Sequence, residues 1–86
     1  MKVYDCSISL VKGMVSWPGD PQFETRDFKL IDKGDSSNIL EMKMSSHAGT
    51  HIDAPAHFFK DALTVDKIPF DILIGKTQVI DFYEND

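Results

Sequence analysis

Cysteine is nearly absent from this sequence: Cys6 is the single one in 86 residues, so no disulfide can form within the chain. No apolar run approaches the ~20 residues of a membrane-spanning helix, and the opening MKVYDCSISL lacks the continuous apolar stretch of a signal peptide. Basic residues are also few, since 9 Lys and Arg stand against 14 Asp and Glu, for a formal net charge of −5. These absences argue against nucleic acid and membrane partners and predict a cytoplasmic protein.

The remaining composition is that of a globular protein, with 42% hydrophobic and 27% charged residues. A chain of this length forms one small domain or part of a larger one. Residues Lys2 to Leu10 alternate between apolar and polar, which predicts a half-buried strand with Cys6 as a small buried hydrophobe. The stretches Phe23 to Ile31 and Ile39 to Ser45 are also strand-like, and the DKGDSSN between them predicts a hairpin-like pairing.

The last third of the chain contains its most helical stretch, Ile68 to Ile74, where Pro69 suits a first helical turn and Gly75 a stop. Lys76 to Tyr83 then has the pattern of another strand. Many strands and almost no helix leave the apolar face of a sheet without a covering layer. We therefore expect residues 1–86 to be the N-terminal portion of a single larger domain.

All three histidines lie in one segment, SSHAGTHIDAPAHFF, which spans residues 45–59. His47 and His51 are four residues apart, a spacing that suits a helical metal site. Gly49 and Pro55 interrupt any such helix. An extended chain instead places alternate side chains on one face, and His47, His51, Asp53 and His57 all occupy odd positions.

Extension alone would hold His47 and His57 too far apart, at ~3.3 Å per residue over the intervening stretch. Gly49 and Pro55 are the positions at which the chain can curl to bring them together. His51 and Asp53 need no such curl, since they are two residues apart on one face, so we expect them to be the pair that binds one ion most tightly.

Imidazole and carboxylate together are the ligand set of catalytic zinc, manganese or iron sites. Such a site keeps one position open for a water molecule that the ion activates, and a remaining histidine can shuttle the proton. The alternative is that these are ordinary loop or core histidines and that Asp53 closes a turn or caps a helix. Their clustering in eleven positions with one parity favours the metal site.

The segment HAGTHIDAPAHF resembles the H-x-G-T-H-x-D-A-P-x-H motif of the cyclase-like metal-dependent hydrolases, a family that includes bacterial kynurenine formamidases and isatin hydrolases. SWPGDP, at residues 16–21, is similar to the upstream W/Y-P-G-D-P loop of that family. VDKIPFDILIGKTQVIDF is similar to the stretch that follows the motif, so the resemblance covers essentially the whole chain.

The resemblance implies an α/β protein with the swivelling β/β/α fold, usually a homo-oligomer, with one or two divalent ions. These ions are zinc in formamidases, which makes zinc the expected metal here, and manganese in isatin hydrolases. Carried over by position, His47, His51 and Asp53 become metal ligands, with Asp53 a plausible bridge between two ions, and His57 becomes the acid/base residue. The family draws a further histidine and glutamate from its second half, which lies beyond Asp86.

The implied activity is metal-dependent hydrolysis of a carbon–nitrogen amide bond in a small molecule, for example the arylformamide N-formylkynurenine. Trp17 either lines the substrate pocket or packs its loop onto the sheet, and Phe58 and Phe59 are expected to pack beneath the site. The alternative function is a metal-binding module without turnover, or an inactive fragment of such an enzyme. Should the 86 residues suffice alone, the acids on neighbouring strands that would have to complete the site are Glu24, Asp27 and Glu41.

Overall fold

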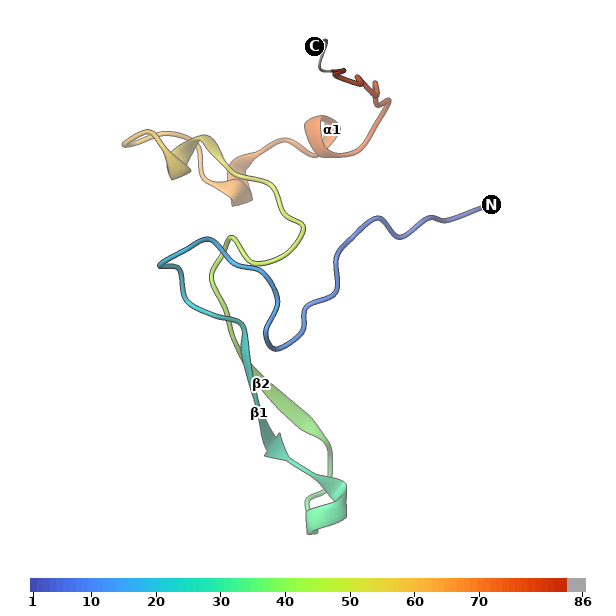
Figure 1. Cartoon of the computed structure of the whole chain (residues 1–86), viewed down its shortest axis with the longest axis vertical. Helices are drawn as coiled ribbons and strands as arrows, with labels where there is room; N and C mark the ends of the chain where they lie inside the picture. The colour runs from blue at the N-terminus through green and yellow to red at the C-terminus, as the bar shows by residue number, and fades with distance from the viewer. Residues whose placement is uncertain (84–86) are drawn as a thin grey trace. The chain divides into compact units, whose positions relative to one another are not determined.

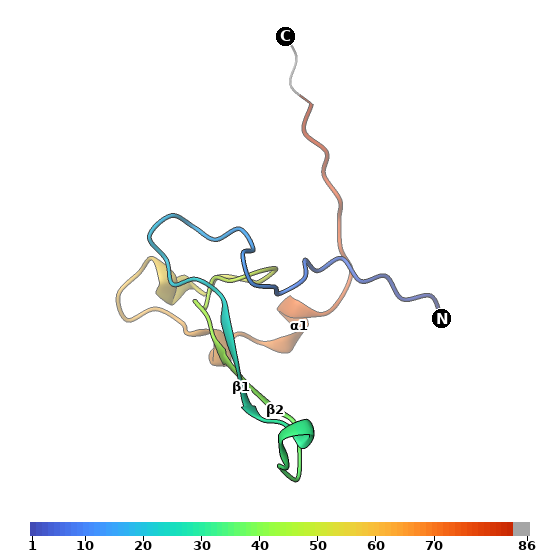
Figure 2. The same ribbon diagram turned by 60° about the horizontal axis from the view of Figure 1, so that its bottom comes forward.

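The computed structural model describes residues 1–83, and the chain divides into two compact units, Met1–Ile52 and Asp53–Asp86. The first unit contains an antiparallel hairpin of strands β1 (Glu24–Lys29) and β2 (Ile39–Lys43), which lie side by side in both views (Figures 1 and 2). This hairpin confirms the pairing that the alternating patterns and the turn-rich connection predict.

Complementary side chains set the register of the hairpin. Glu24 stands opposite Lys43 and Arg26 opposite Glu41, so opposite charges face each other across the strands. Arg26 Nη2 donates to the Glu41 carboxylate, although both side chains are more than half exposed. An exposed pair of this kind contributes about 0–1 kcal/mol, so it supports the register rather than the stability of the hairpin. The register shifts at Phe28, where two residues of β1 oppose one of β2.

The connection between the strands contains a 3-10 helix, Ile31–Lys33, and two side chains beyond it bond back to the backbone at its start. The Asp35 carboxylate accepts the Leu30 N–H at 2.8 Å, and Asn38 Oδ1 accepts the Ile31 N–H at 2.8 Å. These are the local side-chain-to-backbone bonds for which Asp and Asn are favoured in turns. They explain why DKGDSSN closes the hairpin.

The second unit consists of short helical turns joined by extended chain. It holds 3-10 helices at Pro55–His57 and Val65–Lys67 and one α-helical turn, α1 (Phe70–Leu73). The Ala56 N–H donates to the Leu63 carbonyl at 3.0 Å, which closes the loop between the first two turns. No helix of the described residues has the length and hydropathy to cross a membrane.

The helix predicted at Ile68 to Ile74 is present but shorter. Pro69 is the residue before the helix rather than part of its first turn, with φ −59° and ψ 140°. The chain becomes extended at Ile74, so the helix ends ahead of Gly75, and Gly75 does not take the left-handed conformation of a glycine cap.

Two predicted strands and the burial of Cys6 are wrong for the described chain. Residues 2–10 and 76–83 have no regular secondary structure, and Cys6 is exposed. An alternating pattern forms a strand only where a neighbouring strand accepts and donates the ladder hydrogen bonds. In residues 2–10 the backbone bonds side chains instead, since Ser7 N–H donates to Asp5 and Ile8 N–H to Thr50.

The apolar side chains of the described residues are largely exposed, and Phe23, at 6% exposure, is the one that is buried. The two-stranded sheet and the few helical turns fit part of a cyclase-like domain, and the complete swivelling β/β/α fold stays a prediction. Large aromatic residues are among the exposed ones: Trp17, Phe28, Phe58, Phe70 and Phe82.

Exposure on this scale predicts how residues 1–86 behave when expressed alone. We expect them to associate with copies of themselves, because contiguous exposed apolar surface drives association in water. Sedimentation velocity over a concentration series measures this directly. A monomer that unfolds in one cooperative transition would show that the 86 residues form a complete domain.

Candidate metal centre

His47, His51 and Asp53 each direct a ligand atom toward a common point. One nitrogen of each ring and one carboxylate oxygen lie within 4.8 Å of one another. His47 is partly buried, and the other two residues are exposed. The structure therefore gathers the three residues that the motif suggests as ligands, within one stretch of seven residues.

A left-handed residue makes this gathering possible. The chain turns after β2, where the Ser45 hydroxyl accepts the His47 N–H and the Ser45 carbonyl accepts the Ala48 N–H, both at 3.1 Å. Gly49 follows with φ +68°, a conformation that residues with a Cβ rarely adopt. The chain thus turns at Gly49, as predicted, and the turn returns His51 to the vicinity of His47. The approach of His57 to His47, which the curl was predicted to bring about, stays a prediction.

A backbone carbonyl sets the orientation of the His51 ring. Nδ1 of His51 lies 2.7 Å from the Gly49 oxygen. Because a carbonyl can only accept, Nδ1 carries the proton and Nε2 presents its lone pair. A hydrogen bond from the second ring nitrogen to a carbonyl is the usual support of a metal-binding histidine.

The two histidines then have the spacing of ligands to one ion. His47 Nδ1 lies 3.2 Å from His51 Nε2, and the ring centroids are 5.1 Å apart at an interplanar angle of 67°. Two nitrogens that bind one tetrahedral zinc at ~2.05 Å stand ~3.3 Å apart. His47 would bind through Nδ1 and release the proton that it shares with His51.

His57 occupies a different local setting. It ends the 3-10 helix Pro55–His57, and its ring meets the Phe58 ring edge-on, with centroids 4.3 Å apart. The ligand group of the described residues does not include it. The role of His57 in proton transfer stays a prediction.

The aromatic residues around the motif are more exposed than the sequence suggests. Phe58 and Phe59 are 76% and 67% exposed, so the prediction that they pack beneath the site is wrong for the described chain. Trp17 is 76% exposed in a turn where its carbonyl accepts the Asp20 N–H at 3.0 Å. Trp17 therefore does not pack its loop onto the sheet within the described chain, and its place in a substrate pocket stays a prediction.

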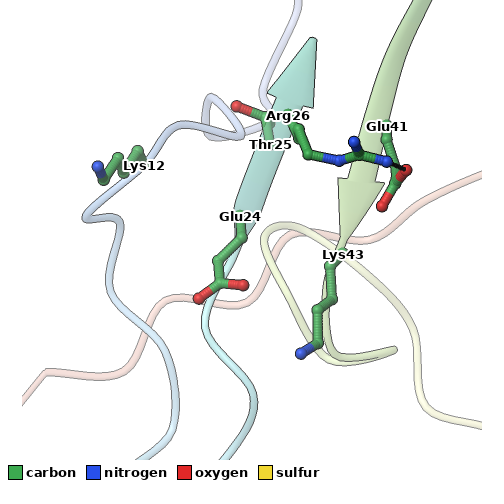
Figure 3. Close-up of a pocket in the computed structure, with 6 residues that line it drawn as sticks. All are labelled: Lys12, Glu24, Thr25, Arg26, Glu41 and Lys43. Atoms are coloured by element: carbon green, nitrogen blue, oxygen red, sulfur yellow. Dashed lines mark hydrogen bonds and ion pairs between the residues drawn. The ribbon is translucent and has the colours of Figure 1, made fainter. Parts of the chain in front are cut away.

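An open hollow of about 430 Å³ lies at the hairpin (Figure 3), and none of the three histidines lines it. Charged side chains dominate its lining, and Arg26 and Glu41 reach toward each other across the two strands. The lining residues are Lys12, Glu24, Thr25, Arg26, Glu41 and Lys43. Glu24 and Glu41, considered above as further ligands, thus line this hollow, and neither they nor Asp27 belong to the histidine group.

Residues 47–53, which carry the three candidate ligands, are called the metal loop below. Sequence reasoning missed two contacts of this loop, one made by its own Thr50 and one by Leu10. The Thr50 hydroxyl accepts the Ile8 N–H at 2.9 Å, and the Leu10 side chain lies against Gly49. A contact across 42 positions leaves no local pattern in the sequence. The one signal for it was the hydroxyl of Thr50, placed between a glycine and a histidine of the motif.

Replacing Gly49 with alanine should lower the free energy of unfolding by about 1–2 kcal/mol, because the left-handed conformation is unfavourable for alanine by this amount. The added Cβ would also lie 2.7 Å from Leu10 Cδ2, although a side-chain tip can move aside. Gly49→Asn should cost less, since asparagine tolerates this conformation. Thermal unfolding of the natural gene product that contains this chain measures the difference.

Gly75→Ala is the matched control, because Gly75 has no positive φ and the nearest atom to its added Cβ is 3.8 Å away. Equal stability of the Gly49→Ala and Gly75→Ala variants would show that the protein does not need the positive φ of Gly49.

A loop that gathers two imidazole nitrogens and a carboxylate oxygen has the ligand set of a divalent-metal site. Residues 4–86 match the family described as "Putative cyclase", and the chain belongs to this family. The resemblance drawn from the histidine motif is thereby confirmed.

Curated relatives of this chain carry the name kynurenine formamidase. The chain is 38% identical to that of Erythrobacter litoralis, over 93% of this chain and 37% of the relative. Identity is 36% with the Bacillus anthracis protein, over 93% and 38%, and 31% with the Salinibacter ruber protein, over 99% and 41%. The chain thus spans about two fifths of the length of these relatives. No solved structure matches it significantly.

Proposed function

We propose that this chain carries the metal-binding part of a hydrolase that opens a carbon–nitrogen amide bond of the arylformamide type. The observation that supports the proposal most strongly is the convergence of His47, His51 and Asp53 within 4.8 Å. The similarity to proteins named kynurenine formamidase supports the choice of substrate class.

The residues present fit a divalent ion. Two nitrogens and one oxygen supply three ligands and leave a position open, as in catalytic rather than structural zinc sites. We propose zinc, with manganese as the alternative, since both accept imidazole and carboxylate. Asp53 has a second carboxylate oxygen with which it would bridge to a second ion.

When bound, the ion polarises the amide carbonyl and activates a water molecule for attack. His47, His51 and Asp53 would hold the ion, and the Gly49 carbonyl keeps the His51 ring in the tautomer whose Nε2 can act as a ligand. In the reaction the water oxygen bonds to the carbonyl carbon while His57 takes one proton from that water. The carbon–nitrogen bond then breaks and His57 passes the same proton to the departing nitrogen, so that the products are an amine and formic acid, which releases its proton to solvent.

An aromatic substrate is consistent with the exposed indole of Trp17, which offers a flat apolar surface for an aryl ring. N-formylkynurenine is the substrate to try first, and we propose that the active species is a homo-oligomer. Residues 1–86 alone should not hydrolyse it, because three ligands from one loop with exposed surroundings fix an ion weakly.

The test compares the natural gene product that contains this chain before and after chelation. We expect about one or two equivalents of zinc or manganese by elemental analysis, hydrolysis of N-formylkynurenine, loss of both on chelation and recovery on adding the ion back. Bound metal without hydrolysis of any arylformamide would favour the metal-binding module without turnover. Hydrolysis that survives complete removal of metal would contradict the proposal.

A further inference from the structure

The segment Ile8–Leu10 touches the metal loop at two adjacent points. The Ile8 N–H donates to Thr50 Oγ1 at 2.9 Å, across 42 positions of sequence. One residue earlier in the loop, a Cβ at Gly49 would lie 2.7 Å from Leu10 Cδ2, so the Leu10 side chain covers the glycine. In Figure 2 the blue trace runs from the N-terminus, which lies away from the yellow-green loop, to a point close to that loop.

These contacts fall on the peptide that orients His51. Thr50 separates Gly49 from His51, and the Gly49 carbonyl is the group that accepts from His51 Nδ1 at 2.7 Å. Anchoring the Thr50 side chain restrains the rotation of the Gly49–Thr50 peptide, and with it the direction of that carbonyl. The Leu10 side chain lies beside the same peptide at its glycine end.

The bond at Thr50 is also specific in its chemistry. Residues 2–10 form no strand within the described chain, so the Ile8 N–H does not belong to a sheet ladder. The Ile8 N–H donates instead to the Thr50 hydroxyl, and this one hydrogen bond connects the segment to the metal loop. A hydroxyl is required there, because valine has the same shape as threonine but no acceptor.

We propose that Ile8–Leu10 is a brace for the metal loop, with Thr50 as a positioning residue that acts on His51 through the Gly49 carbonyl. The brace keeps His51 in the Nδ1–H tautomer, so that Nε2, which lies 3.2 Å from His47 Nδ1 in the metal-free chain, is the atom with which His51 would bind a divalent ion. The inference rests on the proposed function for its purpose, while the tautomer can be observed without metal.

The experiment compares Thr50→Val with Thr50→Ser in the natural gene product that contains this chain. Supporting groups behind metal ligands typically contribute 10–100-fold to metal affinity. Because Thr50 acts through one further peptide, we expect zinc affinity to fall about 10-fold in Thr50→Val, by competition with a chromophoric chelator. Thr50→Ser should restore it, since serine keeps the acceptor. Thr25→Val, an exposed threonine on β1, is the control and should bind zinc normally.

A second readout reports on the ring itself. In metal-free protein, long-range ¹H–¹⁵N correlation spectra should show His51 in the Nδ1–H tautomer in the wild type and in Thr50→Ser. In Thr50→Val a population of the Nε2–H tautomer should appear. An unchanged tautomer and zinc affinity in Thr50→Val would overturn the brace. A wild type that binds no zinc would overturn the proposed function, and the tautomer comparison would still decide on the brace.

Discussion

Replacing His51 with alanine should remove the bound metal and the hydrolytic activity together. His51 is the residue on which the candidate centre depends most, because it adjoins both other members. Its Nε2 lies 3.2 Å from His47 Nδ1, and Asp53 follows two residues later. Without this ring, one histidine and one carboxylate on an exposed loop remain, too few for a stable catalytic zinc site.

Elemental analysis of the purified gene product measures the result. We expect less than about a tenth of the wild-type metal in the His51→Ala variant and no turnover of N-formylkynurenine. Far-ultraviolet circular dichroism provides the control for folding, since His51 is exposed and its removal leaves no cavity. Stoichiometric metal in a folded His51→Ala variant would place the metal site elsewhere in the protein.

Replacing His57 with alanine should leave the metal in place and slow the reaction ~10²–10⁴-fold, the usual contribution of a general acid or base. The structure motivates the distinction, because His57 ends the 3-10 helix Pro55–His57 and stands outside the group of ligand atoms. The loss should appear in kcat rather than in metal affinity, since a proton donor acts in the transition state.

The metal content of the His57→Ala variant decides between two roles. Metal retained with slow turnover identifies His57 as the proton carrier. Metal lost would move His57 into the ligand set, and full activity with a formamide would remove it from the mechanism. Phe58→Ala serves as the neighbouring control, because it removes the ring against His57 while keeping the imidazole.

The hairpin could be predicted from the sequence because every signal for it is local. Alternation in Ile39 to Ser45 and the Asp and Asn residues of the connection act within a few positions of the bonds that they make. The strand at Lys2 to Leu10 was wrong for the opposite reason. Its pattern is equally regular, but a strand needs a partner in space, and within the described chain the Ile8 N–H finds the Thr50 hydroxyl instead.

The candidate site shows the same division. The residue types and their clustering marked His47, His51 and Asp53, and the glycine between the histidines marked the turn, where Gly49 has a positive φ. The parity argument assumed an extended chain and is wrong for residues 46–50, which form a turn and bends. The contacts of Ile8 and Leu10 with this loop leave no trace in local spacing. The exposure of Phe58 was missed because apolar character predicts burial only where a covering layer exists.

X-ray absorption at the zinc edge measures whether the proposed ligands His47, His51 and Asp53 hold one divalent ion. For the zinc-loaded natural gene product we expect a first shell of nitrogen and oxygen at ~2.0–2.1 Å, with multiple scattering from at least two imidazoles. The His51→Ala variant should lose this signal together with the metal. A sulfur shell at ~2.3 Å, the distance of a zinc–thiolate bond such as Cys6 would make, would show that these residues do not form the site.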